Sequence, residues 1–96
     1  MKKRLSIALI IALIISVSMQ AQTLSTKNKK AIELYQNADN YRVRGQYKEA
    51  ITLLNEAISK DKEFEEAYYR LAITYKSMEE FQKATQVYES GLSHAK

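Results

Sequence analysis

Apolar residues recur at intervals of three and four along residues 31–96, and this spacing is the period of an α-helix. The stretches that carry it are about twelve to fourteen residues long, which is a usual length for a helix and too long for an average strand. The chain contains no proline to interrupt them. Polar breaks separate the stretches near Gly45, at 61–66 and at Glu79 and Glu80. We therefore expect an all-α fold of about four helices.

The pattern of residues 31–64 is repeated in residues 65–96 at an offset of thirty-four residues. The matching pairs are mostly small or apolar, as where Ala38 falls on Ala72 and Leu53 on Val87. The other matching pairs are Tyr35 with Tyr69, Tyr41 with Tyr75, Tyr47 with Phe81, Ala50 with Ala84 and Ile58 with Leu92. A stacked helical hairpin repeats its packing positions while its solvent face varies, so we expect two copies of one hairpin.

Small residues at fixed places in each copy predict where the helices come closest. They are Ala38, Ala50 and Ala57 in the first copy, and Ala72, Ala84 and Gly91 in the second. Helix axes reach the short end of the roughly 8 to 10 Å range only where the facing side chains are this small. Bulky residues should be buried on either side of these contacts, namely Tyr41, Tyr47, Leu54, Ile58, Tyr75, Phe81, Tyr88 and Leu92.

The two predicted hairpin turns differ in sequence. Gly45 stands between the helices of the first copy, where a residue free to adopt positive φ ends one helix and turns the chain back. The second copy has Glu79 and Glu80 there, so its turn must close without glycine. Asp61 and the charged run after it predict the junction between the copies.

These residues resemble the tetratricopeptide repeat, a helix-turn-helix family with a period of 34 residues. In the first copy, residues 45–50 read Gly-Gln-Tyr-Lys-Glu-Ala and match the opening of the family's second helix. The second copy follows the pattern more fully, through Ala67, Tyr68, Leu71, Ala72, Tyr75, Phe81, Ala84 and Tyr88. The resemblance implies antiparallel hairpins stacked as a short solenoid, with repeats at 31–64 and 65–96, and a role in protein–protein interaction.

Residues 1–21 read as a secretory signal peptide, with a basic start at 1–4 and an almost continuously apolar run at 5–19. As a helix that run would span about 22 Å, short of the roughly 30 Å hydrocarbon core, which favours cleavage over a permanent span. We expect the cut between Ala21 and Gln22, in surroundings that resemble signal peptides of Gram-negative bacteria. The chain is then exported to the periplasm or outside the cell; the alternative is an uncleaved signal that anchors it in the inner membrane.

Charge argues against a nucleic-acid partner once the signal peptide is removed. Three of the fifteen basic residues leave with it, and twelve then face eleven acidic ones. Nucleic-acid binders concentrate basic residues on one face, whereas here the signs are interleaved. A polar linker at 22–30 carries Lys27, Lys29 and Lys30, and we interpret it as flexible and solvated. The alternative is contact with an anionic lipid or polymer.

The sequence suggests no catalytic site, metal site or cofactor. The chain has no cysteine, and its one histidine, His94, stands where a solvated side chain is the usual state. The adjacent carboxylates Glu65 and Glu66, like Glu79 and Glu80, point about 100° apart on a helix and form no facing acid and base pair. We therefore expect a binding protein and not an enzyme.

The resemblance places the partner-binding surface on the concave face, at five positions of the first helix of each repeat. These are Ile32, Tyr35, Asp39, Arg42, Val43, Glu66, Tyr69, Ile73, Lys76 and Ser77. Tyr35, Tyr69 and Ile73 make this face more apolar than a solvent-exposed helix face usually is. Arg42 and Lys76 add positive charge. Such a face suits an extended peptide or a partner helix. The alternative is that the tyrosines only cover neighbouring helices.

The last predicted helix has an apolar edge without a following helix to cover it, formed by Val87, Tyr88 and Leu92. This edge suggests a fragment of a longer array, self-association, or a marginal module of two repeats. Our leading hypothesis is an exported adaptor that binds a protein or peptide partner. The alternatives are an N-terminal or truncated fragment of a longer envelope signalling or assembly protein, and a scaffold anchored in the inner membrane.

Overall fold

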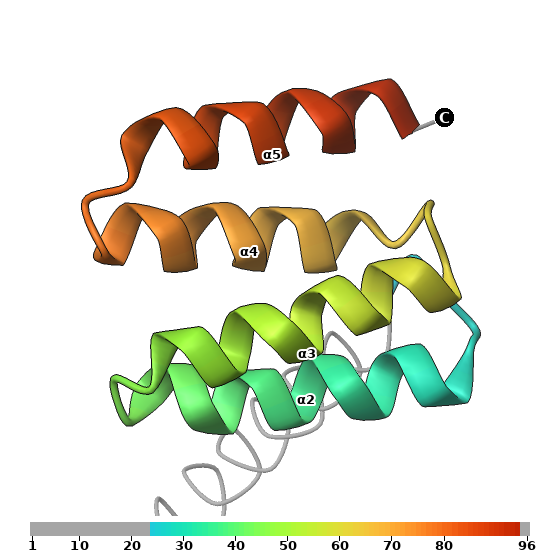
Figure 1. Ribbon diagram of the computed structural model, residues 1–96. Helices are drawn as coiled ribbons and strands as arrows, with labels where there is room; N and C mark the ends of the chain where they lie inside the picture. The colour runs from blue at the N-terminus through green and yellow to red at the C-terminus, as the bar shows by residue number, and fades with distance from the viewer. Residues whose placement is uncertain (1–23, 95–96) are drawn as a thin grey trace, which may run out of the picture.

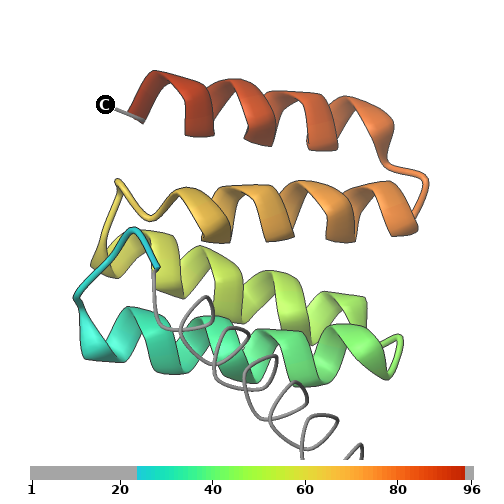
Figure 2. The same cartoon turned by 180° about the vertical axis from the view of Figure 1, so that it is seen from behind.

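The computed structural model describes residues 24–94, which form four α-helices and no strand. The helices are α2 (Lys29–Val43), α3 (Tyr47–Lys60), α4 (Glu65–Ser77) and α5 (Phe81–His94) (Figure 1). Each helix runs antiparallel to the next and packs beside it, as Figure 1 and Figure 2 show from opposite sides. The predicted all-α fold of stacked hairpins is confirmed for these residues. The expected signal peptide at 1–21 lies outside them.

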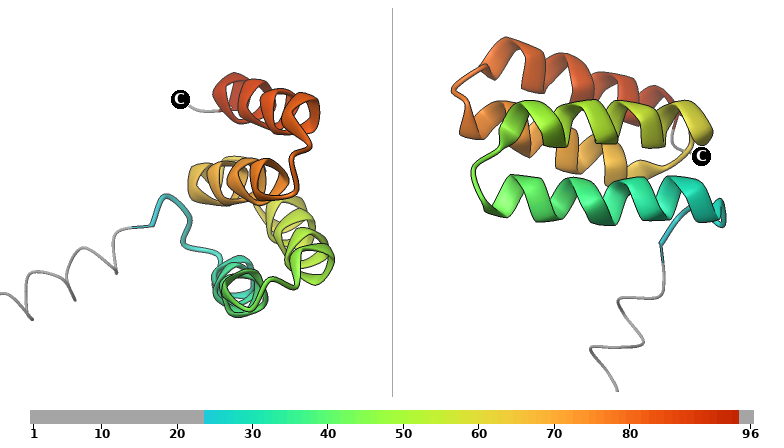
Figure 3. Two further views of the ribbon diagram at one scale, coloured as in Figure 1. Left: turned by 90° about the vertical axis from the view of Figure 1, so that its left-hand side faces the viewer. Right: turned by 60° about the horizontal axis from the view of Figure 1, so that its bottom comes forward.

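The four helices form two layers when the array is viewed end-on (Figure 3, left). One layer holds α2 and α4, and the other holds α3 and α5. Helix α3 packs against both α2 and α4, and α4 packs against both α3 and α5. The first helices of the two hairpins therefore share one face of the molecule.

The core lies where small residues allow the helices to approach. Ala38, Ala50 and Ala57 are completely buried, and Leu54 and Phe64 fill the space beside them with no exposed area. Aromatic and aliphatic side chains of this size stabilise a fold by about 1.5–3 kcal/mol each when fully buried. The predicted close contacts of the first hairpin are confirmed.

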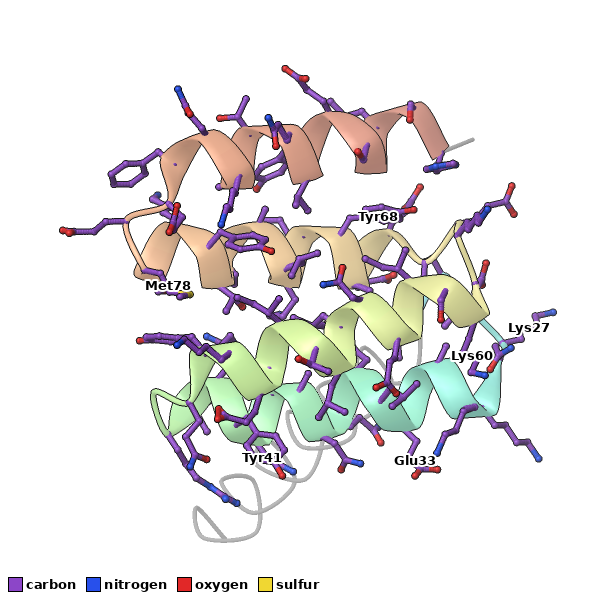
Figure 4. The ribbon with its side chains drawn as sticks, in the orientation of Figure 1. Lys27, Glu33, Tyr41, Lys60, Tyr68 and Met78 are labelled. Atoms are coloured by element: carbon purple, nitrogen blue, oxygen red, sulfur yellow. The ribbon has the colours of Figure 1, made fainter. Side chains whose placement is uncertain are left out.

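Gly91 makes the corresponding close contact in the second hairpin. A Cβ added at Gly91 would lie 2.8 Å from the Cβ of Tyr68, which is closer than real Cβ atoms approach. Tyr68, labelled in Figure 4, lies on the side of α4 that faces α5. Glycine therefore sets the distance between α4 and α5 at this level.

Not every bulky residue predicted to fill the core is buried. Tyr41, Tyr47, Ile58 and Tyr75 are partly buried. Phe81, Tyr88 and Leu92 are 59%, 45% and 73% exposed, so the prediction that they are buried is wrong. The reason is that α4 covers the outer face of α3, whereas no helix within residues 24–94 covers the corresponding face of α5.

The two hairpin turns have the same backbone shape despite their different sequences. Gly45 has φ of 77° and Glu79, thirty-four residues later, has φ of 61°. The N–H of Gly45 donates to the carbonyl of Arg42, and that of Glu79 to the carbonyl of Lys76, each at 2.9 Å. The second turn therefore closes without glycine, as predicted, at a cost of about 1–2 kcal/mol for a left-handed residue with a side chain.

The residues before α2 are not the solvated linker that we expected at 22–30. Helix α2 begins at Lys29, and the side-chain oxygen of Asn28 caps it by accepting the N–H of Ala31 at 2.9 Å. Thr26 is only 4% exposed, and Leu24 packs against the core. The expectation of a solvated segment is wrong at Leu24 and Thr26, whereas Ser25, Lys27 and Asn28 are exposed. Ser25 is bonded to α4, as described below.

None of the helices in residues 24–94 combines the length and the apolar character that crossing a bilayer requires. The apolar run at 5–19 lies outside the described part of the chain.

Candidate partner-binding site

The ten residues predicted to bind a partner lie on α2 and α4, within one layer of the array (Figure 3). Val43, Tyr69, Lys76 and Ser77 are exposed, and Tyr35 is buried. The other five, Ile32, Asp39, Arg42, Glu66 and Ile73, are half-buried. Their role in binding stays a prediction, but their surroundings differ in ways that bear on it.

Tyr35 is packed between the two repeats. Its ring lies 5.1 Å from that of Phe64, measured between centroids, and its exposed fraction is 8%. Its hydroxyl accepts a hydrogen bond of 2.9 Å from Arg70. Burial raises the pKa of this hydroxyl, and the neighbouring Arg70 guanidinium acts in the opposite direction. The ring of Tyr35 therefore joins helices and offers little surface to a partner.

Asp39 joins the two repeats through an ion pair. Both of its oxygens accept hydrogen bonds from Nη1 of Arg70 on α4, at 2.7 and 2.8 Å. One of them also accepts a hydrogen bond from Nε of Arg42, one turn along α2, at 3.2 Å. All three side chains are mostly buried, so water screens their charges less than it would at the surface. This network fixes α4 against α2 within the proposed binding face.

Sequence reasoning missed Arg70, although a signal for it existed. Arg70 lies four residues after Glu66 and three before Ile73, so it belongs to the same helical stripe as these predicted positions. Its guanidinium carbon also lies 5.3 Å from the centre of the Tyr35 ring. Its Nε is buried without a hydrogen-bond partner. Arg70 is thus held mainly by one acid and one aromatic residue.

Glu66 is bonded to Ser25, which sequence reasoning also missed. The backbone N–H and the hydroxyl of Ser25 both donate to the Glu66 carboxylate. The two residues are 41 positions apart in the chain, so no local pattern connects them. One end of the α2–α4 face is consequently in contact with the chain's own N-terminal segment.

Tyr69 is exposed and lines a groove between α4 and α5. Its ring stands edge-on to that of Tyr88, with centroids 5.9 Å apart. The groove encloses about 270 Å³ and is lined by Glu65, Tyr68, Tyr69, Tyr88, Gly91 and Leu92. The structure thereby brings Tyr69, predicted for the concave face, together with Tyr88 and Leu92, which were predicted for the uncovered edge.

Of two further residues of α5, Val87 lies differently from the prediction and His94 lies as predicted. Val87, predicted to be part of the uncovered edge, is partly buried against the core, so that assignment is wrong. It lines a hollow with Tyr68 and Leu71 of α4. His94 is exposed, as expected, and its ring stacks on that of Tyr68 with centroids 5.8 Å apart.

Among residues 24–94, no group of three or more histidine or acidic side chains is placed to hold a metal ion. The adjacent carboxylates at the start of α4 serve different surfaces. Glu66 binds Ser25, while Glu65 lines the α4–α5 groove. They form no facing pair of the kind that acid and base catalysis needs.

Comparisons with known proteins agree with this geometry. A family model described as "TPR repeat" matches residues 38–79, and one described as "Tetratricopeptide repeat" matches residues 67–96. A search of curated proteins finds no match. Members of this family typically act as non-catalytic scaffolds that bind other proteins. By its period, its helix packing and these matches, the chain belongs to the tetratricopeptide repeat family.

Proposed function

We propose that this chain is an exported adaptor that binds a protein or peptide partner through the α2–α4 face. The observation that carries the proposal is Tyr69, whose side chain is 51% exposed on the same layer as Arg42 and Lys76. Tyrosine and arginine contribute disproportionately to binding at the centres of protein interfaces. A half-exposed ring on a layer that also carries two cations is therefore a suitable anchor for a partner.

The charges on this face favour a partner that carries a carboxylate. Arg42 and Arg70 share the single carboxylate of Asp39, so two guanidinium groups face one acid. Lys76 adds a positive charge in the last turn of α4. A segment with an apolar side chain for Tyr69 and an acidic one for these cations would complement the face.

The proposal is tested by capturing partners from cell-envelope extract with the full-length chain and two matched variants. Tyr69→Ala should reduce capture by about tenfold or more, because truncating an aromatic anchor typically costs 2 kcal/mol or more. Phe81→Ala is the control, since it removes a similarly exposed aromatic ring, 59% against 51%, from the other layer. Equal capture by the two variants would contradict the assignment of the α2–α4 face.

We propose in addition that residues 1–21 direct export and are removed between Ala21 and Gln22. The mass of the protein isolated from the periplasm or the medium should correspond to a chain that begins at Gln22. A mass that includes residues 1–21, found in the membrane fraction, would instead support the anchored scaffold. The reading as a piece of a longer envelope signalling or assembly protein is tested by the genomic sequence downstream of Lys96.

A second candidate function is self-association through α5. The observation that favours it is the apolar edge of that helix, where Phe81, Tyr88 and Leu92 are all at least 45% exposed. Apolar surface of this kind is a common site of protein contact. Light scattering should report an assembly that Leu92→Glu dissociates. A monomer at all concentrations would contradict this candidate and leave the adaptor proposal intact.

A further inference from the structure

Residues 24–28, here called the N-terminal strap, are seated on the α2–α4 face. In Figure 3 (left) the strap lies on the side of the array formed by α2 and α4. Asn28, at its end, also donates to the carbonyl of Lys60 on α3 at 3.4 Å. Leu24 packs against the core, and Thr26 is 4% exposed. The strap therefore occupies part of the surface that we propose for a partner.

Ser25 makes the polar contacts that connect the strap to α4. Its N–H donates to both carboxylate oxygens of Glu66, at 3.2 and 3.1 Å. Its hydroxyl donates to Oε1 of Glu66 at 2.5 Å and accepts the backbone N–H of Glu65 at 3.0 Å. Hydrogen bonds to an ionised carboxylate are about twice as strong as those between neutral groups.

Ser25 also supplies a cap that α4 lacks locally. Phe64 occupies the N-cap position and has no side-chain oxygen to accept an N–H from the first turn. Helix α2, by contrast, is capped by its own neighbour Asn28. The start of α4 thus presents a seat made of the Glu65 N–H donor and the Glu66 carboxylate, and the group that fills this seat comes from 40 residues away.

The seat suits one kind of residue in one conformation. It needs a backbone N–H and a hydroxyl on the same residue, which only serine, threonine and, less compactly, tyrosine provide. The strap is neither helix nor strand, so no helical or strand hydrogen bond occupies the N–H of Ser25, which points at Glu66. A helical ligand would commit most of its N–H groups to its own carbonyls. An extended segment with serine or threonine therefore fits best.

We propose that the strap is an intramolecular ligand of the α2–α4 face, and that the partner is an extended segment whose serine or threonine replaces Ser25 at Glu66. The part that concerns the partner rests on the proposed adaptor function. The proposed cut after Ala21 leaves the strap in the mature chain. Partner binding then requires the strap to leave its seat. The apparent affinity for the partner equals the affinity of the open form multiplied by the fraction of molecules in which the strap is open.

The seating of the strap is tested by thiol labelling of the full-length variant Thr26→Cys, since the natural chain has no cysteine. A maleimide reaches this buried position only when the strap opens. Adding Glu66→Gln should raise the labelling rate about tenfold or more, because the bonds to Ser25 lose their charge. The matched control is Glu65→Gln, which removes a neighbouring charge but keeps the N–H that Ser25 accepts. It should change the rate by no more than about twofold.

Two results of this experiment would overturn the seating. One is labelling of Thr26→Cys as fast as that of Ser59→Cys, an exposed position on α3. The other is equal acceleration by the two glutamine substitutions. Circular dichroism checks that each variant keeps its helices. Should Thr26→Cys lose them, Leu24→Cys replaces it, at a partly buried position that packs against the core, and its labelling rate is again compared with that of Ser59→Cys.

The ligand chemistry is tested with a synthetic peptide of residues 22–28, Gln-Thr-Leu-Ser-Thr-Lys-Asn, added to the full-length chain. Ser25→Pro removes both the N–H and the hydroxyl and should empty the seat. The peptide should bind Ser25→Pro at least about tenfold more tightly than the natural chain, in fluorescence anisotropy. Adding Glu66→Gln, or replacing the serine of the peptide by alanine, should abolish that gain.

Equal peptide binding by Ser25→Pro and the natural chain would overturn the strap as a ligand of this face. This outcome is separable from failure of the adaptor proposal. Suppose that Tyr69→Ala loses partner capture while Ser25→Pro and the natural chain bind the peptide equally. The α2–α4 face would then still be the partner-binding face, and only the role of the strap as its ligand would be rejected. If Tyr69→Ala still captures the partner and the peptide binds at Glu66, the assignment of the partner to the α2–α4 face would be rejected, and the seat for a serine at Glu66 would be supported.

Discussion

The two hairpins use the same positions for packing, yet these positions have different environments. Leu54 on α3 is completely buried, whereas Tyr88, the residue thirty-four positions later on α5, is 45% exposed. Helix α4 lies over the outer face of α3, and no helix within residues 24–94 lies over that of α5. Burial in this array is therefore decided by the next element in the stack as well as by the hydrophobicity of the residue itself.

The hairpins also differ at the positions where α2 and α4 face each other. Asp39 on α2 pairs with Arg70 on α4, but their equivalents in the other repeat are Ile73 and Gln36. The ion pair therefore belongs to the joint between the repeats and is absent from the repeated pattern. Positions that match between the two repeats pack each hairpin. Positions that differ determine how the two hairpins pack against each other and which side chains are exposed on the α2–α4 face.

The largest expected effect separates the covered helix from the uncovered one. Leu54→Ala should lower the free energy of unfolding by about 2–5 kcal/mol, because it leaves a cavity in the core. Leu92→Ala makes the same change at a position that is 73% exposed and should cost no more than about 0.5 kcal/mol. Urea unfolding followed by circular dichroism measures both. Similar costs would mean that the outer face of α5 is covered in solution.

A smaller effect is expected at the joint between the repeats. Arg70→Met should cost about 1–2 kcal/mol of unfolding free energy, because Asp39 loses two charged hydrogen bonds and keeps only Arg42. Arg44→Met is the control, because it removes an exposed arginine at the C-terminal end of α2, in the same layer as α4. If the two variants unfold at the same urea concentration, the ion pair contributes nothing to the joint.

The hairpin turns should respond to substitution with opposite signs. Glu79→Gly should stabilise the protein by up to about 1 kcal/mol, because it relieves a left-handed backbone with a side chain. Gly45→Ala should destabilise it by about 1 kcal/mol, through the backbone alone, since no atom lies within 4 Å of the added Cβ. Thermal unfolding measures both shifts. Shifts of the same sign would show that the two turns are not equivalent.

The smallest effect is a loss of stability at alkaline pH. Burial raises the pKa of Tyr35 and of Tyr68 above the usual tyrosine value of about 10. The unfolded chain therefore releases these protons first, so stability is full below about pH 10 and falls as pH rises through the pKa of the folded state. Tyr35→Phe should make this decline shallower in urea unfolding between about pH 9 and 11. An unchanged slope would contradict the contribution of Tyr35.

The fold was predictable from the sequence because its signals are local or periodic. The close contact at Ala57 recurs at Gly91, and the turn at Gly45 recurs at Glu79, so the repeat itself revealed both hairpins. The exposure of Phe81 was not predictable in this way. Its counterpart Tyr47 has the same place in the pattern, and the difference comes from a neighbouring helix that one hairpin has and the other lacks.

The candidate site was only partly predictable, because its polar contacts join distant residues. The positions of Tyr69 and Lys76 on one layer followed from the helical period. The pairing of Asp39 with Arg70 depends on which charged side chains meet across two helices. The bond from Ser25 to Glu66 spans 41 residues and starts in a segment whose composition is typical of a solvated linker.

The central claim is that a partner binds the α2–α4 face and not the outer face of α5. Hydrogen exchange of the full-length chain, with and without a partner captured by it, tests this claim most directly. We predict slower exchange in α4 around Tyr69 on binding, faster exchange in the strap at residues 24–28, and little change along α5 away from Tyr88, which touches Tyr69. Slower exchange confined to α5, with the strap and α4 unchanged, would contradict the claim.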